Sequence, residues 1–471
     1  MEKINIGKNR EVFWDNYLID TERTTAFHRV MEPTKKESVF AFDKGFELLS
    51  ISYPHLVKVG DTHRLYYITS NGREDAPQGY LAVIESTDGF NWHKPHLNIF
   101  DMPELTENNI VLPVIDNAFV FTDTNPSCPE NEKFKAVVKV VDHDAKEPEM
   151  IEMLWCYTSP DGYHFTKSHM MTNKGHFDSL NTAHWNGEKY LAFIRSFHNI
   201  IPGGEISDAT RDVRVMYSDD IKTWTTPELI EFNDDLDYPL YTNNVIPCER
   251  APQILMGFPT RYEEKRTWEG TTQQLPSFPR KKAASEKFNL DRVGRVVTDG
   301  IFMCSRDGKS WYRYNEPFFA NGYESIENWV YGDAYPCYGF IDSGFETYYM
   351  YRIDGKLGSE PKRLSRYEIT KDRFACIMAD SVEKVLVTNP IIFDGKELHL
   401  NFSGTAFGYM YLDVLDENGN PLSGESYEIY GDTIDRTVIF PDGSDFSKFA
   451  GTPVRLRFRM MNTKLFSLKF E

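Results

Sequence analysis

The sequence predicts an all-β protein in which a five-bladed β-propeller is followed by a C-terminal β-sandwich. Three observations lead to this fold class: a turn motif repeated along the chain, an aromatic content of 14%, and a change of pattern near residue 380. A high aromatic content favours β-structure over helix. We expect the propeller to cover residues 1–380 and the sandwich to cover residues 381–471.

The turn motif reads Ser-x-Asp-Gly-x-x-aromatic. It begins at Ser86, Ser159 and Ser305, and a looser copy at Ser218 has Ile in place of Gly. Each copy lies between two strand-like runs, where Asp-Gly favours a hairpin turn because Gly accepts a positive φ. Residues 363–374 resemble a decayed fifth copy. Units of about 70 residues exceed the ~40–50 of a typical propeller blade because their loops are long.

Each predicted blade opens with a strand that lines the central axis. These opening strands lie, in chain order, near His55, Asp116, Phe177, Tyr241 and Trp329. An earlier strand candidate within residues 11–30 is expected to complete the last blade of the closed ring. A polar insertion over residues 263–295 interrupts blade four, and the alternatives for it are a lid, a contact in a homo-oligomer and a solvated loop.

The pattern changes after residue 380. Residues 398–402, 409–414 and 454–458 alternate between apolar and polar side chains, and Asn418-Gly419 marks a turn between strands. The turn motif of the blades does not recur in this region. Strands of this kind over about ninety residues predict a separate β-sandwich.

Charge and cysteine content exclude several classes of protein. The net charge of −19 argues against a nucleic-acid partner, because phosphate binding needs a basic surface. Six scattered cysteines without a C-x-x-C pair predict free thiols rather than disulfides or a zinc site. No run approaches the ~18 apolar residues of a membrane span, and residues 1–8 lack the apolar core of a signal peptide. We therefore expect a cytoplasmic protein that does not bind membranes.

Polar residues that open the inner strands of a propeller converge on one funnel, where a ligand can bind. The candidates are, from blade one to blade five, His55, Asp116 and Asn117, Asp178, Asn243, and Asp333. The alternative is that these side chains cap turns or hold neighbouring blades together. Convergence of the whole set favours a site.

Carboxylates that face each other suit the cleavage of glycosides. One carboxyl group must be protonated to donate to the leaving oxygen, and the other must be ionised to act as base or nucleophile. The catalytic candidates are Asp178, Asp333 and Glu324, although Glu324 also fits a surface loop. Their separation would decide between retention, at roughly 5–5.5 Å, and inversion, at roughly 6.5–9.5 Å, and the sequence leaves it open.

Further residues are predicted to bind the substrate. Arg195, Arg261 and Arg352 each follow a strongly apolar strand, where a cation needs a partner. Two roles are predicted for them, holding substrate hydroxyls or tuning the acids, and salt bridges between blades are the alternative. Asp299 precedes the strand that starts at Gly300, where capping a turn is the alternative. Trp329 is a candidate for stacking on a sugar face, with packing between blades as the alternative. Motifs for serine hydrolases, phosphate loops and zinc proteases are absent from the sequence.

The repeats and the C-terminal strands together resemble the five-bladed β-propeller glycoside hydrolases, both the invertase- and levanase-like enzymes and the arabinanase- and xylosidase-like group. The invertase segments W-M-N-D-P-N-G, R-D-P and E-C are absent, so no catalytic residue carries over from them. Residues 177–181, 257–261, 298–303 and 328–333 instead look like segments of bacterial proteins labelled glycosidase-like.

This resemblance implies a glycosidase of carbohydrate metabolism that cleaves a small oligosaccharide or glycoside by paired-carboxylate chemistry. It implies no cofactor, and the sequence shows no ligand spacing for a structural Ca²⁺. Two alternatives remain: a non-catalytic carbohydrate-binding propeller, and a glycoside phosphorylase that uses inorganic phosphate and needs basic residues in the funnel.

Overall fold

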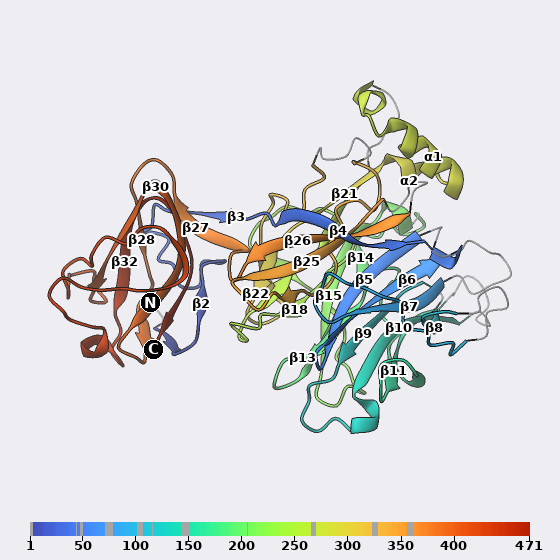
Figure 1. Ribbon diagram of the computed structural model, residues 1–471, viewed down its shortest axis with the longest axis horizontal. Coiled ribbons are helices and arrows are strands. Elements are labelled where there is room, and N and C mark those ends of the chain that lie inside the picture. The colour runs from blue at the N-terminus through green and yellow to red at the C-terminus, as the bar shows by residue number, and fades with distance from the viewer. Residues whose placement is uncertain are drawn as a thin grey trace.

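The computed structural model consists of two β-rich parts that lie side by side (Figure 1). It describes residues 3–43, 45–47, 50–70, 79–100, 107–114, 116–142, 151–204, 206–264, 270–322, 328–355 and 361–471. Two α-helices, α1 (Phe278–Phe288) and α2 (Asp291–Arg295), occur in these residues, and neither is long and apolar enough to cross a membrane. All six cysteines are free thiols, as the sequence predicts.

The larger part confirms the predicted five-bladed propeller within the described residues. Its first three blades are four-stranded antiparallel sheets whose strands follow one another in chain order. Blade one contains β5 (Ser50–Val59), β6 (Thr62–Ser70), β7 (Gly79–Ser86) and β8 (Ile110–Val114). Blade two contains β9 (Ala118–Thr122), β10 (Phe134–Asp142), β11 (Ile151–Ser159) and β12 (Thr166–Thr172). Blade three contains β13 (Thr182–Trp185), β14 (Tyr190–His198), β15 (Thr210–Ser218) and β16 (Glu228–Leu229).

Blade four carries the insertion. Its antiparallel strands are β18 (Ile246–Pro247), β19 (Leu255–Gly257), β22 (Met303–Ser305) and β23 (Ser310–Arg313). A short strand, β17 (Glu231–Phe232), runs parallel to β23 at the edge of this sheet. Between β19 and β22 the chain forms a two-stranded ribbon of β20 (Thr260–Glu264) and β21 (Val296–Gly300), and α1 and α2 lie between these two strands in the sequence.

Blade five is closed by a strand from the N-terminal region. It contains β24 (Ile341–Asp342), β25 (Thr347–Asp354), β26 (Lys362–Thr370) and, paired with β26, β4 (Thr34–Phe42). The prediction that residues 11–30 close the ring is wrong, because these residues pair with C-terminal strands. The indole of Trp14 is fully buried, with its ring centroid 5.4 Å from those of Phe302 and Phe374. This segment therefore packs between the propeller and the C-terminal strands.

The smaller part is built on two long antiparallel strands, β30 (Leu398–Leu415) and β32 (Arg455–Phe470). The remaining strands are β1 (Ile4–Gly7), β2 (Glu11–Val12), β3 (Phe27–Val30), β27 (Ala375–Ala379), β28 (Lys384–Val387), β29 (Ile391–Phe393) and β31 (Asp432–Thr437). Residues 4–30 thus pair with this part, whereas the sequence placed them with the propeller. The predicted strands after residue 380 are present, and their division into the two sheets of a sandwich stays a prediction.

The repeated turn motif has the geometry that its residues predict. In the first copy, Ser86 Oγ accepts the N–H of Gly89 at 2.9 Å, and Gly89 has a φ of +78°. The Gly89 carbonyl oxygen accepts the indole N–H of Trp92 at 3.0 Å and the hydroxyl of Tyr351 at 2.9 Å. Tyr351 belongs to blade five, so this turn also joins the first blade to the last.

Gly89→Ala tests whether the turn motif closes the ring. A Cβ at this position would lie 2.6 Å from Tyr351 Oη at an unfavourable φ of +78°, so we expect a loss of about 3 kcal/mol in the free energy of unfolding. Gly60→Ala is the matched control, because Gly60 has a φ of +58° and nothing within 4 Å of the added Cβ. Urea unfolding measures both variants, and equal losses would contradict a role in closure.

Candidate active site

Three of the predicted pocket residues are buried and bonded to a neighbouring blade, and His55 is the first. Its side chain is fully buried, and Nε2 accepts the N–H of Val120 at 2.9 Å while Nδ1 donates to the carbonyl oxygen of Tyr53 at 2.9 Å. Burial lowers the pKa of His55 to about 4, which keeps the neutral form that accepts this bond. His55 therefore joins blade one to blade two, and the prediction that it binds substrate is corrected.

Asn117 and Asn243 are buried clamps of the same kind. The Asn117 amide donates to the carbonyl oxygen of Phe177 at 2.6 Å and joins blades two and three. The Asn243 amide donates to the carbonyl oxygens of Leu180 and Phe193, each at 3.0 Å, and joins blades four and three. Buried backbone carbonyls need such partners, so these two amides are occupied by the fold rather than offered to a substrate.

A cluster of tyrosines lies where the inner strands meet. The hydroxyls of Tyr53 and Tyr241 are 3.1 Å apart, and Tyr331 donates to the hydroxyl of Tyr241 at 3.3 Å. Tyr262 stacks on Tyr241 with ring centroids 5.6 Å apart, and Tyr335 lies 6.0 Å from Tyr241 by the same measure. The sequence prediction missed Tyr53, Tyr241 and Tyr262 as site residues, although Tyr241 opens a predicted blade and Tyr53 lies two residues before His55.

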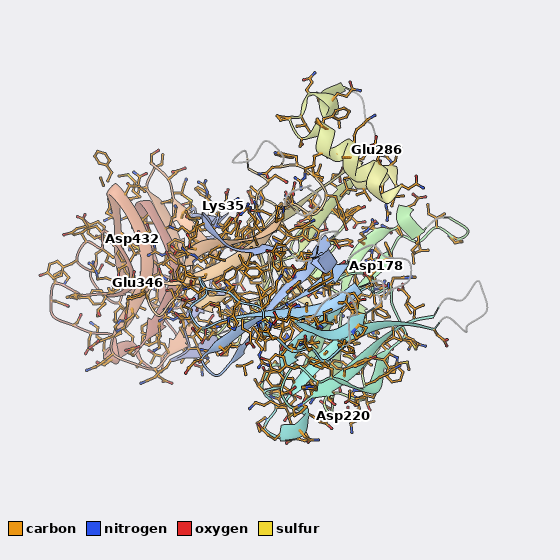
Figure 2. All side chains as sticks on the ribbon, turned by 45° about the vertical axis from the view of Figure 1, so that its right-hand side comes forward. Lys35, Asp178, Asp220, Glu286, Glu346 and Asp432 are labelled. Atoms are coloured by element: carbon orange, nitrogen blue, oxygen red, sulfur yellow. The ribbon has the colours of Figure 1, made fainter. Side chains whose placement is uncertain are left out.

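Asp178 is the most accessible carboxylate beside this cluster. Its side chain is 47% exposed, while its ion-pair partner Arg195 is only 1% exposed. The hydroxyl of Tyr53 donates to the backbone carbonyl of Asp178 at 3.2 Å, which places the residue at the edge of the tyrosines. Figure 2 shows Asp178 at the end of the propeller from which α1, with Glu286, projects. A buried cation favours the ionised form of a carboxylate that it contacts.

The guanidinium group of Arg195 packs against aromatic rings. Its guanidinium carbon lies 4.0 Å from the ring centroid of Phe197 and 5.9 Å from that of Tyr241. Burial lowers the pKa of Arg195 to about 10, which still leaves it charged at neutral pH. Of the two roles predicted for Arg195, the structure favours tuning an acid, because its ion pair is with Asp178 of the same blade.

Asp116 forms a second ion-pair group at the funnel. Lys139 Nζ lies 3.2 Å from Asp116 Oδ2 and 2.8 Å from Glu152 Oε1. Burial alone would raise the pKa of Glu152, but the hydrogen bond and charge of Lys139 and the N–H of Phe177 lower it. The Asp116 side chain remains 32% exposed, so it can still contact a ligand.

Asp333 is held differently, in a buried loop under the insertion. Its carboxylate accepts the N–H of Val330 at 2.8 Å and pairs with Arg280 of α1 at 3.2 Å. Burial raises the pKa of Asp333 above its usual value, despite the opposing effects of Arg280 and the Val330 amide. The insertion is therefore not a solvated loop, since Ala284 of α1 also packs on Val330. The alternative predicted for Asp333, that it caps its own turn, is also present, because its carboxylate accepts the N–H of Val330.

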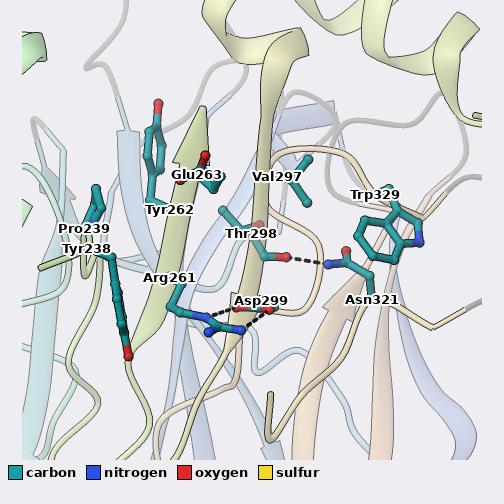
Figure 3. A pocket seen from close by; sticks show the side chains of 10 residues that line it. All are labelled: Tyr238, Pro239, Arg261, Tyr262, Glu263, Val297, Thr298, Asp299, Asn321 and Trp329. Atoms are coloured by element: carbon teal, nitrogen blue, oxygen red, sulfur yellow. Dashed lines mark hydrogen bonds and ion pairs between the residues drawn. The ribbon is translucent and has the colours of Figure 1, made fainter. Parts of the chain in front are cut away.

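A further cavity of about 320 Å³, named here the lateral pocket, is lined in part by the predicted residues Arg261, Asp299 and Trp329 (Figure 3). Its lining comprises Tyr238, Pro239, Arg261, Tyr262, Glu263, Val297, Thr298, Asp299, Asn321 and Trp329. Arg261 and Asp299 form a two-point ion pair with distances of 2.7 and 2.6 Å. Asp178 is not among the residues that line this cavity, and the sharing of one funnel by all these side chains stays a prediction.

Arg352, another predicted substrate-binding residue, does not join either group. Arg352 is 3% exposed and donates to Asp354 of its own strand at 2.7 Å, so it stabilises blade five and is not presented to a substrate. Glu324 lies outside the described residues. Within the described part of the chain, no three His, Cys, Asp or Glu side chains come together as metal ligands.

Backbone strain gathers around the tyrosine cluster and the Asp333 loop. Tyr53, Trp329 and Ala334 have φ values of +53°, +80° and +58°, a region that side chains other than Gly rarely adopt. Such strain costs of order 1–3 kcal/mol for each residue and is concentrated at functional sites in proteins generally. These positions support the assignment of a site to this end of the propeller.

Comparison with known proteins finds only distant similarity. No protein-family model matches the sequence, and no curated protein matches it. One similar structure is an N-acetylgalactosamine deacetylase from F. plautii, with 11% identity, a TM-score of 0.43, and coverage of 74% of this chain and 96% of that chain. Another is an α-L-arabinanase from Penicillium chrysogenum, with 11% identity, a TM-score of 0.39, and coverage of 74% and 100%.

A third similar structure is an α-L-arabinofuranosidase from Fusarium graminearum, with 10% identity, a TM-score of 0.40, and coverage of 72% of this chain and 98% of that chain. The printed names of these three proteins describe different activities. One fold supports many chemistries, so the function of this chain has to follow from the side chains of its own site.

The buried His55 predicts a pH dependence of stability. Its pKa is about 4 in the folded protein and about 6.5 when unfolded, so the stabilisation is complete above pH 6.5 and is lost as the pH falls toward 4. At pH 5 we expect His55 to account for a loss of about 2 kcal/mol relative to pH 7.

Urea unfolding at the two pH values, with His55→Asn compared with His96→Asn, measures this loss. His96 is an exposed histidine whose side chain is 67% accessible, so its replacement should leave the pH dependence unchanged. If His55→Asn keeps the full loss between pH 7 and pH 5, then His55 is not the buried neutral clamp described above.

Proposed function

We propose that the protein is a glycoside hydrolase whose reaction takes place at Asp178 above the tyrosine cluster. One observation carries this proposal: a 47% exposed carboxylate is held by an arginine that is only 1% exposed. An ionised carboxylate that is both fixed and accessible suits a base or nucleophile in glycoside cleavage. Of the tyrosines beside it, Tyr331 is partly exposed and supplies aromatic surface for a sugar ring, whereas Tyr53 and Tyr241 are buried.

We assign the role of general acid to Asp333. A general acid must be protonated at the working pH, and burial raises the pKa of Asp333. Its loop reaches the same tyrosines, because Tyr331, two residues earlier, donates to the hydroxyl of Tyr241. Asp116, with a partly exposed carboxylate beside Lys139, is placed as a residue that binds substrate hydroxyls.

A second candidate function is phosphate-dependent cleavage, and Arg211 favours it. Arg211 is 6% exposed, and it has no ion-pair partner among the residues that the structure describes. Its guanidinium carbon lies 4.1 Å from the ring centroid of Tyr262, and its charge lowers the pKa of the neighbouring Arg195. A phosphorylase would turn over faster with added phosphate and lose this response in Arg211→Met, whereas a hydrolase would not respond to phosphate.

Asp178→Asn is expected to reduce kcat/KM by about 10³-fold, because the amide cannot act as base or nucleophile. Product release from aryl glycosides and small oligosaccharides measures the effect. Asp61→Asn, an exposed aspartate in the turn between β5 and β6, is the control and should keep wild-type turnover. Turnover that survives in a correctly folded Asp178→Asn protein would remove Asp178 from the reaction.

A binding module gives a different result in the same assays. It would bind one of the sugars saturably and release no product, in the wild type as well as in Asp178→Asn. That outcome would replace the hydrolase proposal by the carbohydrate-binding alternative.

Asp333→Asn is expected to change the pH dependence of turnover. If Asp333 is the general acid, kcat/KM of the wild type falls as the pH rises through the raised pKa of this carboxyl group. The Asn variant should lose most of its activity on substrates with poor leaving groups and should lack this alkaline limb. If Asp333→Asn keeps the alkaline limb of the pH profile and Asp116→Asn loses it, then Asp116 rather than Asp333 is the general acid.

A further inference from the structure

The lateral pocket borders the tyrosine cluster at the β20–β21 ribbon, because Tyr262 belongs to the cluster and also lines the pocket. Tyr262 stacks on Tyr241 of the cluster, whereas its neighbour Arg261 lies across the ribbon from Asp299, beside Tyr238. The lining of the lateral pocket therefore includes one member of the tyrosine cluster, but it does not include Asp178.

Trp329 forms one wall of the lateral pocket. Its side chain is 45% exposed, and the indole N–H donates to the carbonyl oxygen of Gly322 at 3.2 Å, which fixes the ring (Figure 3). The residue has a φ of +80°, a conformation that is unfavourable for a bulky side chain. A large aromatic ring that is held in a strained conformation and left accessible is better explained by a ligand than by packing.

Asn321, which lines the same cavity, has an unpaired acceptor. Its amide nitrogen donates to the carbonyl oxygen of Thr298 at 2.9 Å, and this bond sets which end of the amide is oxygen. Asn321 is 5% exposed, and its Oδ1 has no hydrogen-bond partner in the described residues. An unsatisfied buried acceptor costs about 1–3 kcal/mol, so a donor supplied by a ligand would stabilise this arrangement.

The charges of the lateral pocket disfavour an anionic ligand, because Glu263 adds a carboxylate to the paired Arg261 and Asp299. Arg261 and Asp299 neutralise each other, and their side chains remain 25% and 22% exposed. Arg261 also donates to the carbonyl oxygen of Asn315 at 2.7 Å, which holds the pair in place. A fixed pair of this kind offers hydrogen bonds to hydroxyl groups without a net charge that would select an ion.

We propose that the lateral pocket binds a neutral sugar ring, which stacks on Trp329 and donates hydroxyl hydrogen bonds to Asn321 Oδ1 and Asp299. The cavity, at about 320 Å³, has the size of a site for a small ligand. The choice of carbohydrate rests on the proposed hydrolase function, for which this site would hold a part of the glycan remote from Asp178. Binding at this site requires neither turnover nor the Asp178 carboxylate.

Trp329→Gly is the sharpest test, because Gly removes the indole and also accepts the φ of +80°. Isothermal titration in the Asp178→Asn background would use cellotetraose, xylotetraose, mannotetraose and arabinotetraose as probes. We expect one of them to bind, about tenfold more weakly after Trp329→Gly and with little change after Trp329→Phe. Phe345→Ala is the matched control, since Phe345 is an 81% exposed aromatic residue outside the lateral pocket.

The outcomes separate this proposal from the hydrolase proposal. Binding that depends on Trp329 in a protein without turnover on any glycoside would contradict the hydrolase proposal and keep the sugar site. Equal binding before and after Trp329→Gly, with circular dichroism showing an intact fold, would overturn the sugar site. Failure of all four sugars to bind would overturn it as well.

Discussion

Closure of the propeller depends on buried polar side chains that bridge neighbouring inner strands. His55 bonds to blade two, Asn117 and Asn243 bond to blade three, and Asn244 donates to the carbonyl oxygen of Pro336 before blade five at 2.9 Å. Blades five and one are joined by backbone bonds, including one of 3.0 Å from Leu56 to Tyr338. Inner strands expose backbone groups where blades meet, and such groups need partners when buried.

This constraint decides which polar residues remain for chemistry. Amides that complete the ring cannot also bind a substrate, so the funnel is left with ion pairs and tyrosine hydroxyls. The carboxylate of Asp178 is accessible and is held in place by Arg195. The carboxylate of Asp333 is instead covered by Arg280 from the insertion. The insertion thus projects from the propeller (Figure 1) but contacts the proposed general acid through Arg280.

The turn motif made the fold predictable, because Ser86, Gly89 and Trp92 act within one short segment and need no distant partner. For His55, Asn117 and Asn243 at the blade openings, the side on which the side chains point was not predicted. The sequence could not show that His55 meets Val120 of another blade. Closure by residues 11–30 was wrong for the same reason, since their pairing depends on strands near the C-terminus.

The site was predictable only in part. Asp178 was predicted from its place before an inner strand, but its ion pair joins it to Arg195, a residue of the next strand that no local pattern links to it. The pairing of Arg261 with Asp299 spans the whole insertion, so no local pattern indicates it. Tyr53 and Tyr241 were missed because aromatic residues at blade openings are also expected in a core.

A crystal structure of the Asp178→Asn protein soaked with an oligosaccharide that the wild type cleaves would test the central claim most directly. The account predicts that a glycosidic oxygen lies beside the amide of residue 178, with a sugar ring against Tyr331. A sugar bound only in the lateral pocket, or at another place with the tyrosine cluster empty, would contradict it.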